Sequence, residues 1–281
     1  GRKVATVPLP DTSLEEIIGL MVGRKLSDKF PRHRSSPGRE MLRVEGLTRY
    51  GVLHDISFNL RAGEIVGLTG LVGSGRTSLV RAIFGLDQVD EGNVYVTGER
   101  VAIDSPQTAI NLGLGLLTED REEQGLVLEM STSQNITLAA LDRDWPGPFL
   151  NHQAELDLAE HYIRRLNIKP ASPNHQTRFL SGGMQQKVIL SRWLATRSRV
   201  LIFDQPTRGV DVGSKVEIYR FMTDLIRRGI AIMIVSSDLP EILGMCDRIL
   251  VLREGMLVAS LTRDQATPEV IMAYAKEGRL T

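Results

Sequence analysis

The sequence predicts an α/β fold in which a mainly parallel sheet is flanked by helices. From about residue 41, short apolar strands alternate with amphipathic helices, and this alternation is typical of a parallel sheet with helices on its faces. A glycine-rich turn at residues 70–77 joins an apolar strand to a helix. A second apolar strand, residues 199–204, ends in the acidic residue Asp204. These three features predict one large α/β domain with polar groups at its strand ends.

The composition is that of a globular protein. The 281 residues are enough for one large α/β domain or two small ones. Lys plus Arg (34) equal Asp plus Glu (34), so no global positive field attracts nucleic acid, and we expect no nucleic-acid partner. The only cysteine, Cys246, suits a reducing compartment. No apolar run approaches the roughly 20 residues that cross a bilayer, so a role at a membrane requires another chain that crosses it.

Residues 1–40 differ from the rest of the chain. The segment TSLEEIIGLM at residues 12–21 combines a capping signal with apolar residues at helical spacing, which predicts one short helix. Residues 25–39 are basic, contain proline and hold few apolar side chains, which marks a linker. We therefore expect a domain boundary near residue 40. Because the chain starts with Gly1, we also expect a fragment of a longer polypeptide.

The elements of the first half follow from hydrophobic periodicity. Ile56, Phe58 and Leu60 alternate with polar residues, as expected of a half-buried strand. In chain order we expect strands at 52–60 and 64–69, a helix at 76–84, short strands between about 88 and 117, and a helix at 153–168. The section from about 125 to 198 is predicted to be an inserted helical lobe.

The second half continues the alternation. We expect a strand at 199–204, a helix at 215–228, a strand at 230–236, a short helix from Pro240, and a hairpin at 248–261. Glu254 and Gly255 stand between the two apolar runs of that hairpin and are predicted to form its tip.

Residues 70–77, GLVGSGRT, predict a phosphate-binding loop. Glycines at such a turn allow backbone N–H groups to face phosphate oxygens, and the helix that follows adds its N-terminal dipole. The pattern GxxxxGK[ST] is met except at Arg76, whose planar guanidinium replaces a compact ammonium. The candidate ATP-binding residues of this loop are Gly70, Gly73, Ser74, Gly75, Arg76, Thr77 and Ser78. The alternative is a glycine-rich turn without a ligand.

Two later segments complete the pattern. Residues 180–187 read LSGGMQQK and lead into a helix, and residues 199–211 read RVLIFDQPTRGVD. Asp204 can bind Mg²⁺ together with the Thr77 hydroxyl, because Mg²⁺ takes oxygen ligands and substrate phosphates. Ser181, Gly182 and Gly183 would present a hydroxyl and backbone donors to an anion. Taken separately, the serine and glycines could be an ordinary helix start, and Asp204 a polar strand end.

A phosphate loop, then LSGGxQQ, then an apolar strand ending in Asp resembles the ABC-type ATPases. Further segments, TEDREEQGL (118–126), DQPTRGVDVG (204–213) and VSSDLPEILGMCDRILVLREG (235–255), resemble the C-terminal half of the tandem ATPase subunits of ribose, galactose, xylose and arabinose importers. The resemblance covers nearly all of the chain from about residue 41. It implies an ABC ATPase fold with an antiparallel β subdomain and a helical signature subdomain.

The resemblance also implies domains, ligands, partners and a location. Residues 1–40 would be the tail of a preceding ATPase half plus a linker, and residues 41–281 the nucleotide-binding domain. ATP and Mg²⁺ would be the ligands. The domain would pair head to tail with the preceding half, or with a homodimer mate, whose γ-phosphate the signature residues would contact: Ser181, Gly182, Gly183 and Gln185. Transmembrane permease subunits, and indirectly a periplasmic sugar-binding protein, would be the partners at the cytoplasmic face of the bacterial inner membrane.

Four positions depart from the general ABC pattern. Arg76 replaces lysine, Glu119 stands where many ABC domains carry a glutamine that senses Mg²⁺ and γ-phosphate, and Ser237 stands where a switch histidine is expected. These three are usual in this half of the sugar subunits. Gln205 differs, because this half usually carries a general-base glutamate there, and losing a general base typically costs about 10²- to 10⁴-fold in rate. Natural divergence and an engineered substitution both fit this glutamine.

We therefore predict a domain that binds ATP with Mg²⁺ but hydrolyses it slowly or not at all. Tyr50, just before the strand at 52–60, is the candidate adenine platform, or else an ordinary surface tyrosine. We expect residues 118–130 to contact the permease, although Glu119, Asp120 and Arg121 could equally form a solvated charge cluster. Two alternatives are a nucleotide-responsive half that does not hydrolyse, and a soluble ABC ATPase outside transport. The transported sugar would be selected by other subunits.

Overall fold

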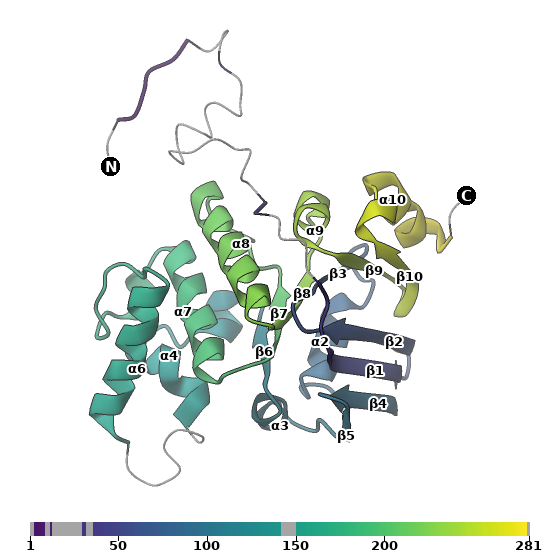
Figure 1. Cartoon of the computed structure of the whole chain (residues 1–281), viewed down its shortest axis with the longest axis horizontal. Helices are drawn as coiled ribbons and strands as arrows, with labels where there is room; N and C mark the ends of the chain where they lie inside the picture. Colours follow the sequence, from purple (N-terminus) through teal and green to yellow (C-terminus); the bar gives the residue numbers. More distant parts are fainter. Residues whose placement is uncertain (1–2, 9–11, 13–29, 32–35, 142–149, 280–281) are drawn as a thin grey trace.

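Two β-sheets and a group of helices make up the computed structural model, which describes residues 3–8, 12, 30–31, 36–141 and 150–279 (Figure 1). The predicted α/β fold is confirmed, with a mainly parallel sheet at its centre. The helix predicted within 12–21 falls almost entirely outside the described residues.

The central sheet has six strands in the order β10-β9-β3-β8-β7-β6. Five of them run parallel, and only β10 runs antiparallel to its neighbour β9. Their bounds are β3 Ile65–Thr69, β6 Leu114–Leu117, β7 Val200–Asp204, β8 Ala231–Val235, β9 Arg248–Arg253 and β10 Met256–Thr262. Every residue of β3, β7 and β8 is buried, which explains why these strands are almost continuously apolar.

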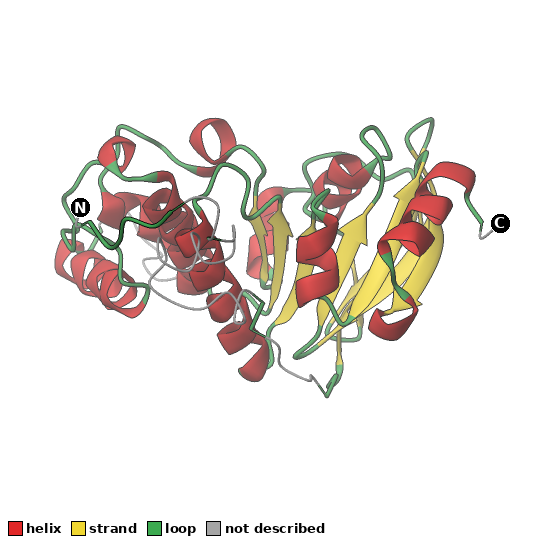
Figure 2. Ribbon diagram, turned by 90° about the horizontal axis from the view of Figure 1, so that it is seen from above, coloured by secondary structure: helices red, strands yellow, loops and turns green. Residues whose placement is uncertain are grey.

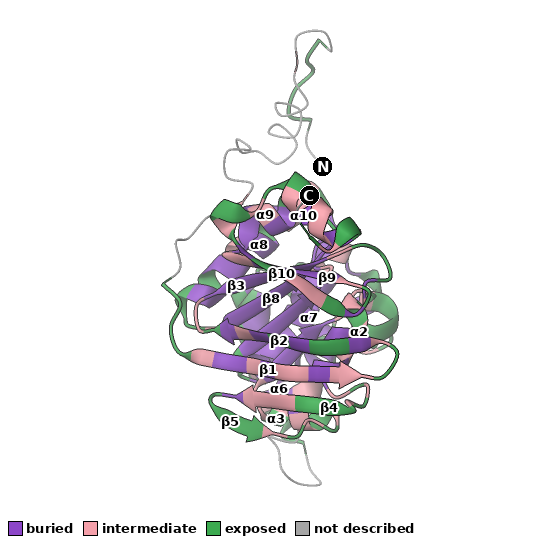
Figure 3. Cartoon of the chain, turned by 90° about the vertical axis from the view of Figure 1, so that its right-hand side faces the viewer, coloured by how far each residue is buried: buried purple, intermediate pink, exposed green. Residues whose placement is uncertain are grey.

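The second sheet is antiparallel, with four strands in the order β2-β1-β4-β5. Its strands are β1 Glu40–Arg49, β2 Leu53–Arg61, β4 Glu91–Val96 and β5 Glu99–Val101. Burial alternates along β2, as the spacing of Ile56, Phe58 and Leu60 predicts, because one face of this sheet packs on the core. Figure 3 shows β3 and β8 buried inside the molecule and β5 exposed at its edge.

Helices surround the central sheet and form a separate lobe at one end (Figure 2). The lobe contains α4, α6 and α7, which contact one another. The helices are α2 Arg76–Ile83, α3 Pro106–Asn111, α4 Thr132–Thr137, α6 His152–Arg165, α7 Gly182–Ala195, α8 Val212–Arg227, α9 Leu239–Met245 and α10 Pro268–Glu277. Helix α8 lies against β8 and α9 against β3, so both cover the strands that end at the predicted site.

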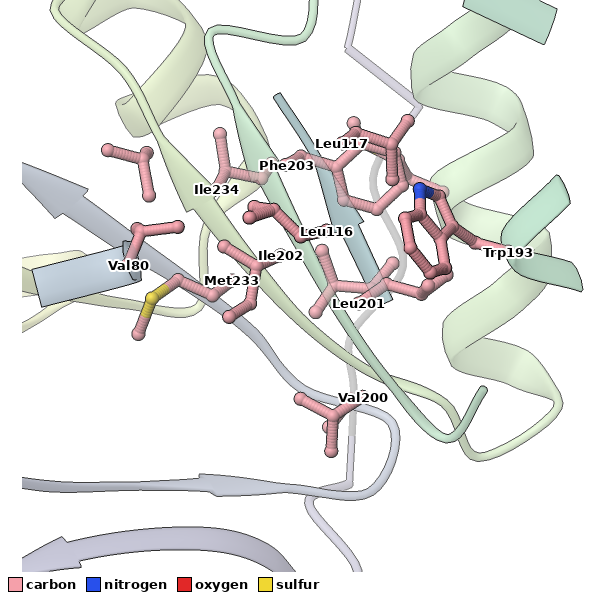
Figure 4. Close-up of a cluster of buried hydrophobic side chains, with 14 of the residues drawn as sticks. Val80, Leu116, Leu117, Trp193, Val200, Leu201, Ile202, Phe203, Met233 and Ile234 are labelled. Carbon is pink, nitrogen blue, oxygen red and sulfur yellow. The ribbon is translucent and has the colours of Figure 1, made fainter. Parts of the chain in front are cut away.

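A continuous apolar core joins the lobe to the sheet. Figure 4 shows Trp193 of α7 facing Leu201 and Phe203 of β7. Trp193 also meets the ring of Phe84 edge to face, with 5.7 Å between ring centroids. Phe203 is fully buried, and full burial of such a side chain stabilises a fold by about 1.5–3 kcal/mol.

Local chemistry explains where several elements begin and turn. Helix α8 starts at Val212, three residues before the predicted start, because the Asp211 side chain accepts a hydrogen bond from the backbone N–H of Ser214 (3.0 Å) and caps it. The predicted hairpin tip is confirmed. Glu254 and Gly255 both have positive φ values, 47° and 75°, as the tightest hairpin turns require.

Candidate functional site

The candidate site lies where three neighbouring parallel strands end. Strands β3, β8 and β7 are adjacent in the sheet, so their carboxyl ends share one edge. The glycine-rich loop follows β3, Asp204 ends β7, and Ser236 follows β8. An open cavity of about 1000 Å³ occupies this edge. It brings together most of the predicted residues: Gly73, Ser74, Gly75, Arg76, Thr77, Ser78, Glu119, Asp204, Gln205 and Ser237.

The glycines of the loop are required by its geometry. A Cβ atom on Gly70 would lie 2.2 Å from the carbonyl oxygen of Leu252, so only glycine fits there. Gly75 precedes α2 with a φ of 99°, in the left-handed region that favours glycine. No side chain caps α2, and its first turn holds no acidic residue. The N–H groups of that turn are therefore available to an anion in the cavity.

Two polar side chains of the loop have buried atoms without a partner among the described residues. They are the Ser74 hydroxyl and Nη1 of Arg76. Desolvation lowers the pKa of Arg76, while the negative charges of Asp204 and Glu119 oppose that shift. A buried donor without an acceptor costs about 1–3 kcal/mol, so these atoms fit a ligand that supplies acceptors, as phosphate oxygens do.

Asp204 provides the carboxylate of the site. Its side chain is buried, and burial raises its pKa to about 6, with a further contribution from the negative charge of Glu119 and an opposing one from Arg76. The exposed Thr77 lines the same cavity. A buried carboxylate and a hydroxyl that line one cavity with the glycine-rich loop fit Mg²⁺, which takes oxygen ligands and usually shares them with substrate phosphates.

Gln205 and Ser237, which the sequence predicts at substituted catalytic positions, touch each other. Nε2 of Gln205 donates a hydrogen bond to the Ser237 hydroxyl over 3.3 Å. Gln205 has a φ of 48°, which is uncommon for a residue other than glycine and occurs often at functional sites. The hydrogen bond from the Gln205 backbone N–H to the Val235 carbonyl (2.8 Å) holds this conformation against β8.

Glu119 lines the same cavity. It forms an ion pair with Arg208, which follows Gln205 by three residues. Arg121 donates to the Arg208 carbonyl over 3.2 Å and to Oε1 of Gln185 over 3.2 Å. The segment after β6 is therefore tied both to the loop after β7 and to the start of α7.

The signature residues stand apart from the cavity. Ser181 precedes α7, is exposed and makes no side-chain capping bond. Gly183 faces the start of α8, where a Cβ atom would lie 2.4 Å from the Ser214 hydroxyl, and Gln185 is buried. The structure does not bring Ser181, Gly182, Gly183 or Gln185 to the phosphate loop of this chain.

Tyr50 does not line the cavity. Its side chain is 67% exposed, and its hydroxyl donates to Glu91 at the edge of the antiparallel sheet. Burial plays little part in its raised pKa, which follows mainly from the hydrogen bond to Glu91 and the negative charge of that residue. Gly51, Val52 and His54 line the cavity instead.

The cavity also contains polar residues that the sequence analysis did not assign to the site. They are His54, Thr207, Arg208, Lys215, Asp238, Glu241 and Glu254. Five of them lie inside the segments 204–213 and 235–255 that carry the family resemblance, but the sequence does not show that these side chains reach the cavity. His54 and Lys215 lie outside those segments, and the packing of β2 and α8 brings them to the site.

Among the described residues, none of the helices has both the length and the apolar character of a membrane span. Within the same residues, no group of three or more His, Cys, Asp or Glu side chains is arranged to hold a metal by itself.

Comparison with known proteins identifies the family. Residues 53–208 match the family described as ABC transporter. The chain is 47% identical over 279 residues to a ribose import ATP-binding protein RbsA of Bacillus licheniformis, covering 99% of this chain and 57% of the relative. A protein of the same name from Geobacillus kaustophilus is 46% identical, with 99% of this chain and 56% of that protein covered. The chain thus spans about half the length of the curated relatives it matches.

Solved structures of ATP-binding cassettes share this fold. A nucleotide-free cassette from an ABC transporter has a TM-score of 0.71 and 22% identity, covering 85% of this chain and all of the other. The cassette MJ0796, in a dimer bound to ADP and Pi, has a TM-score of 0.68 and 22% identity, covering 79% of this chain and 99% of the other. The fold is that of the P-loop ABC ATPases, and the match over residues 53–208 shows that the chain belongs to the ABC transporter family.

Proposed function

We propose that this chain is one ATP-binding half of a tandem ATPase that energises the import of a monosaccharide. The observation that carries the proposal is the meeting of free donors and a buried carboxylate in one cavity, at Arg76, Ser74 and Asp204. The names of the relatives, which are ribose import ATP-binding proteins, support sugar import. The length of those relatives supports a second half, since this chain accounts for about 57% of one of them.

The residues of the loop would bind the triphosphate. Backbone N–H groups at 70–78 and the guanidinium of Arg76 would neutralise its charge, and Asp204 with Thr77 would hold its Mg²⁺. When bound, Mg²⁺ would neutralise charge on the β- and γ-phosphate oxygens. Glu119 faces the same space and would respond to the ligand's charge through its pair with Arg208.

Gln205 would limit hydrolysis at this site. Its amide can orient a water but cannot take a proton from it, because a neutral amide is not a base at pH 7. Its hydrogen bond to Ser237 fixes the amide where the base would stand. A glutamate at this position could accept a hydrogen bond from the same hydroxyl, so the loop needs no rearrangement to accommodate it.

The signature would serve a second domain. Ser181 is exposed and uncapped, away from the cavity of its own chain, and the start of α7 would donate to the γ-phosphate of the preceding half or of a homodimer mate. Permease subunits would contact residues 121–130, with a periplasmic sugar-binding protein acting through them. This arrangement would place the chain peripherally at the cytoplasmic face of the inner membrane.

Phosphate release tests the altered hydrolytic site. We expect little ATP turnover by the chain, and an increase of about 10²-fold or more for Gln205→Glu, because the substitution supplies a proton acceptor. Gln107→Glu, at an exposed position on α3, is the matched control and should leave turnover unchanged. Brisk turnover before the substitution would reject the altered-site proposal.

The same assay on the tandem protein separates the alternatives. A half that only responds to nucleotide would keep its bound ATP intact through a single turnover of the tandem protein. A hydrolysing half would convert that ATP to ADP. Capture of the permease, weakened by substitutions at 121–130, would separate transport from a soluble ATPase outside transport.

A further inference from the structure

Residues Phe30 and Pro31, which belong to the predicted linker, make contacts with α8 and α9. The ring of Phe30 lies 5.3 Å from that of Tyr219 on α8, with 39° between the ring planes. Thr223, one turn further along α8, donates a hydrogen bond to the Pro31 carbonyl over 3.0 Å. A Cβ atom on Gly244 of α9 would lie 2.4 Å from the Phe30 ring, so the ring occupies space that only a glycine leaves open.

Tyr219 connects this aromatic contact to the interior. It is fully buried, and its hydroxyl donates to Oε1 of Glu241 over 3.0 Å. Glu241 is buried as well, at 2% exposure, and accepts a second hydrogen bond from the Thr207 hydroxyl over 3.0 Å. Burial raises the pKa of Glu241, and the hydrogen bonds that it accepts oppose the shift by stabilising the carboxylate.

The partners of Glu241 belong to the two loops that border the phosphate cavity. Thr207 lies two residues after Gln205, in a turn closed by the hydrogen bond from the Arg208 N–H to the Gln205 carbonyl (3.1 Å). Glu241 itself lies in the first turn of α9, which Asp238 caps. The backbone N–H of Asp238 donates a hydrogen bond to the Ser236 hydroxyl (3.0 Å). One buried carboxylate therefore holds the loop at 205–211 against the segment at 236–241.

We propose that Phe30 anchors the linker between α8 and α9 and that Glu241 is a positioning residue. Docking of the linker thereby sets the position of the loops at 205–211 and 236–238. The path runs from Phe30 through Tyr219 and Glu241 to Thr207. Its significance for catalysis rests on the proposed nucleotide site, because Gln205 and Ser237 lie in these loops. The linker that joins the two ATPase halves thus acts on the site without touching nucleotide.

Amide hydrogen exchange on the nucleotide-free chain tests this coupling. Phe30→Ala removes the ring that anchors the linker. Tyr219→Phe keeps the aromatic ring of residue 219 but removes the hydroxyl that donates to Glu241. Each should speed exchange at residues 207–211 and 236–239 about tenfold, because the loops open locally, and change exchange in β3 and β7 less than twofold. The double variant should add little to either single change, since both break the same path.

Two controls and one rescue sharpen the test. Phe221→Ala truncates a phenylalanine of α8 that lines a different cavity with Leu166 and Lys187, and Tyr274→Phe removes a tyrosine hydroxyl on α10. Neither should affect the two loops selectively. Glu241→Gln keeps an acceptor oxygen and should restore most of the loop protection that Glu241→Ala loses, with thermal melting used to check that each variant is folded.

Three results would overturn the proposal. Unchanged amide exchange in both loops for Phe30→Ala would show that docking of Phe30 does not position these loops. Equal acceleration of amide exchange in the loops and in the strands would show that Phe30 contributes only to the stability of the whole domain. Additive single effects would show that Phe30 and Tyr219 act independently. Protection of residues 70–78 by ADP with Mg²⁺ in the unsubstituted chain is read separately, so the failure of the nucleotide site is distinguishable from the failure of the coupling.

Discussion

Arg76 is partly buried in the candidate site, and we propose that it binds nucleotide there. Its Nη1 is buried without a partner among the described residues, and its charge faces Asp204 and Glu119. The two carboxylates therefore favour the charged guanidinium, although Nη1 has no hydrogen-bond acceptor among the described residues. A phosphate oxygen would supply the missing acceptor.

Replacing Arg76 should weaken nucleotide binding more than it affects folding. A hydrogen bond to a charged group contributes about 1.5–3 kcal/mol, so we expect Arg76→Ala to raise the Kd for ATP with Mg²⁺ by about 10- to 150-fold. Arg76→Lys should recover part of the loss. Arg100→Ala, at an exposed position on β5, is the control for a lost positive charge. Equal affinities for Arg76→Ala and the unsubstituted chain, measured with a fluorescent nucleotide, would contradict this role.

Asp204 should make stability depend on pH. Because its pKa is raised to about 6, the folded state disfavours the carboxylate. This cost is absent below the ordinary pKa of 3.8, grows as the pH rises, and is complete above about pH 6. We expect Asp204→Asn to raise the free energy of unfolding of the nucleotide-free chain by about 1–3 kcal/mol near pH 7.5, and by only a small fraction of that near pH 4.

Urea unfolding at the two pH values measures this effect. Asp157→Asn, on the exposed face of α6, is the matched control and should show neither the gain nor the pH dependence. The same Asp204→Asn chain should lose the stabilisation that Mg²⁺ and nucleotide give the unsubstituted chain. A substitution that destabilises the nucleotide-free chain near pH 7.5 would contradict our account of Asp204.

At the scale of elements, the start of α8 links a cap to the signature. Asp211 accepts hydrogen bonds from the Ser214 N–H (3.0 Å) and hydroxyl (2.6 Å), which lower the pKa of its carboxyl group. Ser214 in turn packs against Gly183. The cap therefore fixes the place where α7 and α8 begin side by side.

Loss of this cap should lower the free energy of unfolding moderately, and a different substitution at the same position should restore most of it. Asp211→Ala should lower the free energy of unfolding by about 1 kcal/mol, because an N–H group at the start of α8 loses its acceptor. Asp211→Asn retains a side-chain oxygen and should recover most of that loss. Thermal unfolding of the two variants measures the difference. Equal losses for both would show that charge, rather than capping, is what Asp211 supplies.

The elements that the sequence predicted best are those with strong local signals. Buried strands β3, β7 and β8 are continuous apolar runs, and the Glu254-Gly255 tip is a turn that only a few residue types favour. Helix α10 was not predicted, although Thr267 and Pro268 form a recognisable helix start. The early start of α8 was missed because it depends on the Asp211 cap rather than on apolar spacing.

The candidate site was only partly predictable for a related reason. Motifs indicated the residues at the ends of β3 and β7, because each motif is continuous in sequence. His54 and Lys215 reach the cavity through the packing of β2 and α8, which no local pattern encodes. Tyr50 precedes β2 as expected. Its hydroxyl donates a hydrogen bond to Glu91 of β4, and the residue does not line the cavity.

At the scale of the whole molecule, the parallel sheet organises the site. Three strands deliver the glycine loop, Asp204 and Ser236 to one edge, while α7 presents Ser181 at a different place on the surface. One chain thus carries the cavity at residues 73–78 and, apart from it, the exposed Ser181 at the start of α7. This separation supports the proposal that a second domain completes the site.

Calorimetric titration with ATP or ADP measures nucleotide binding without a need for turnover. We expect saturable binding of one nucleotide per chain in the presence of Mg²⁺, weakened when a chelator removes the ion and when Arg76 is replaced by alanine. Absence of binding with Mg²⁺ present, both for this chain and for the chain joined to the proposed preceding half, would contradict a nucleotide site at residues 70–78 and Asp204.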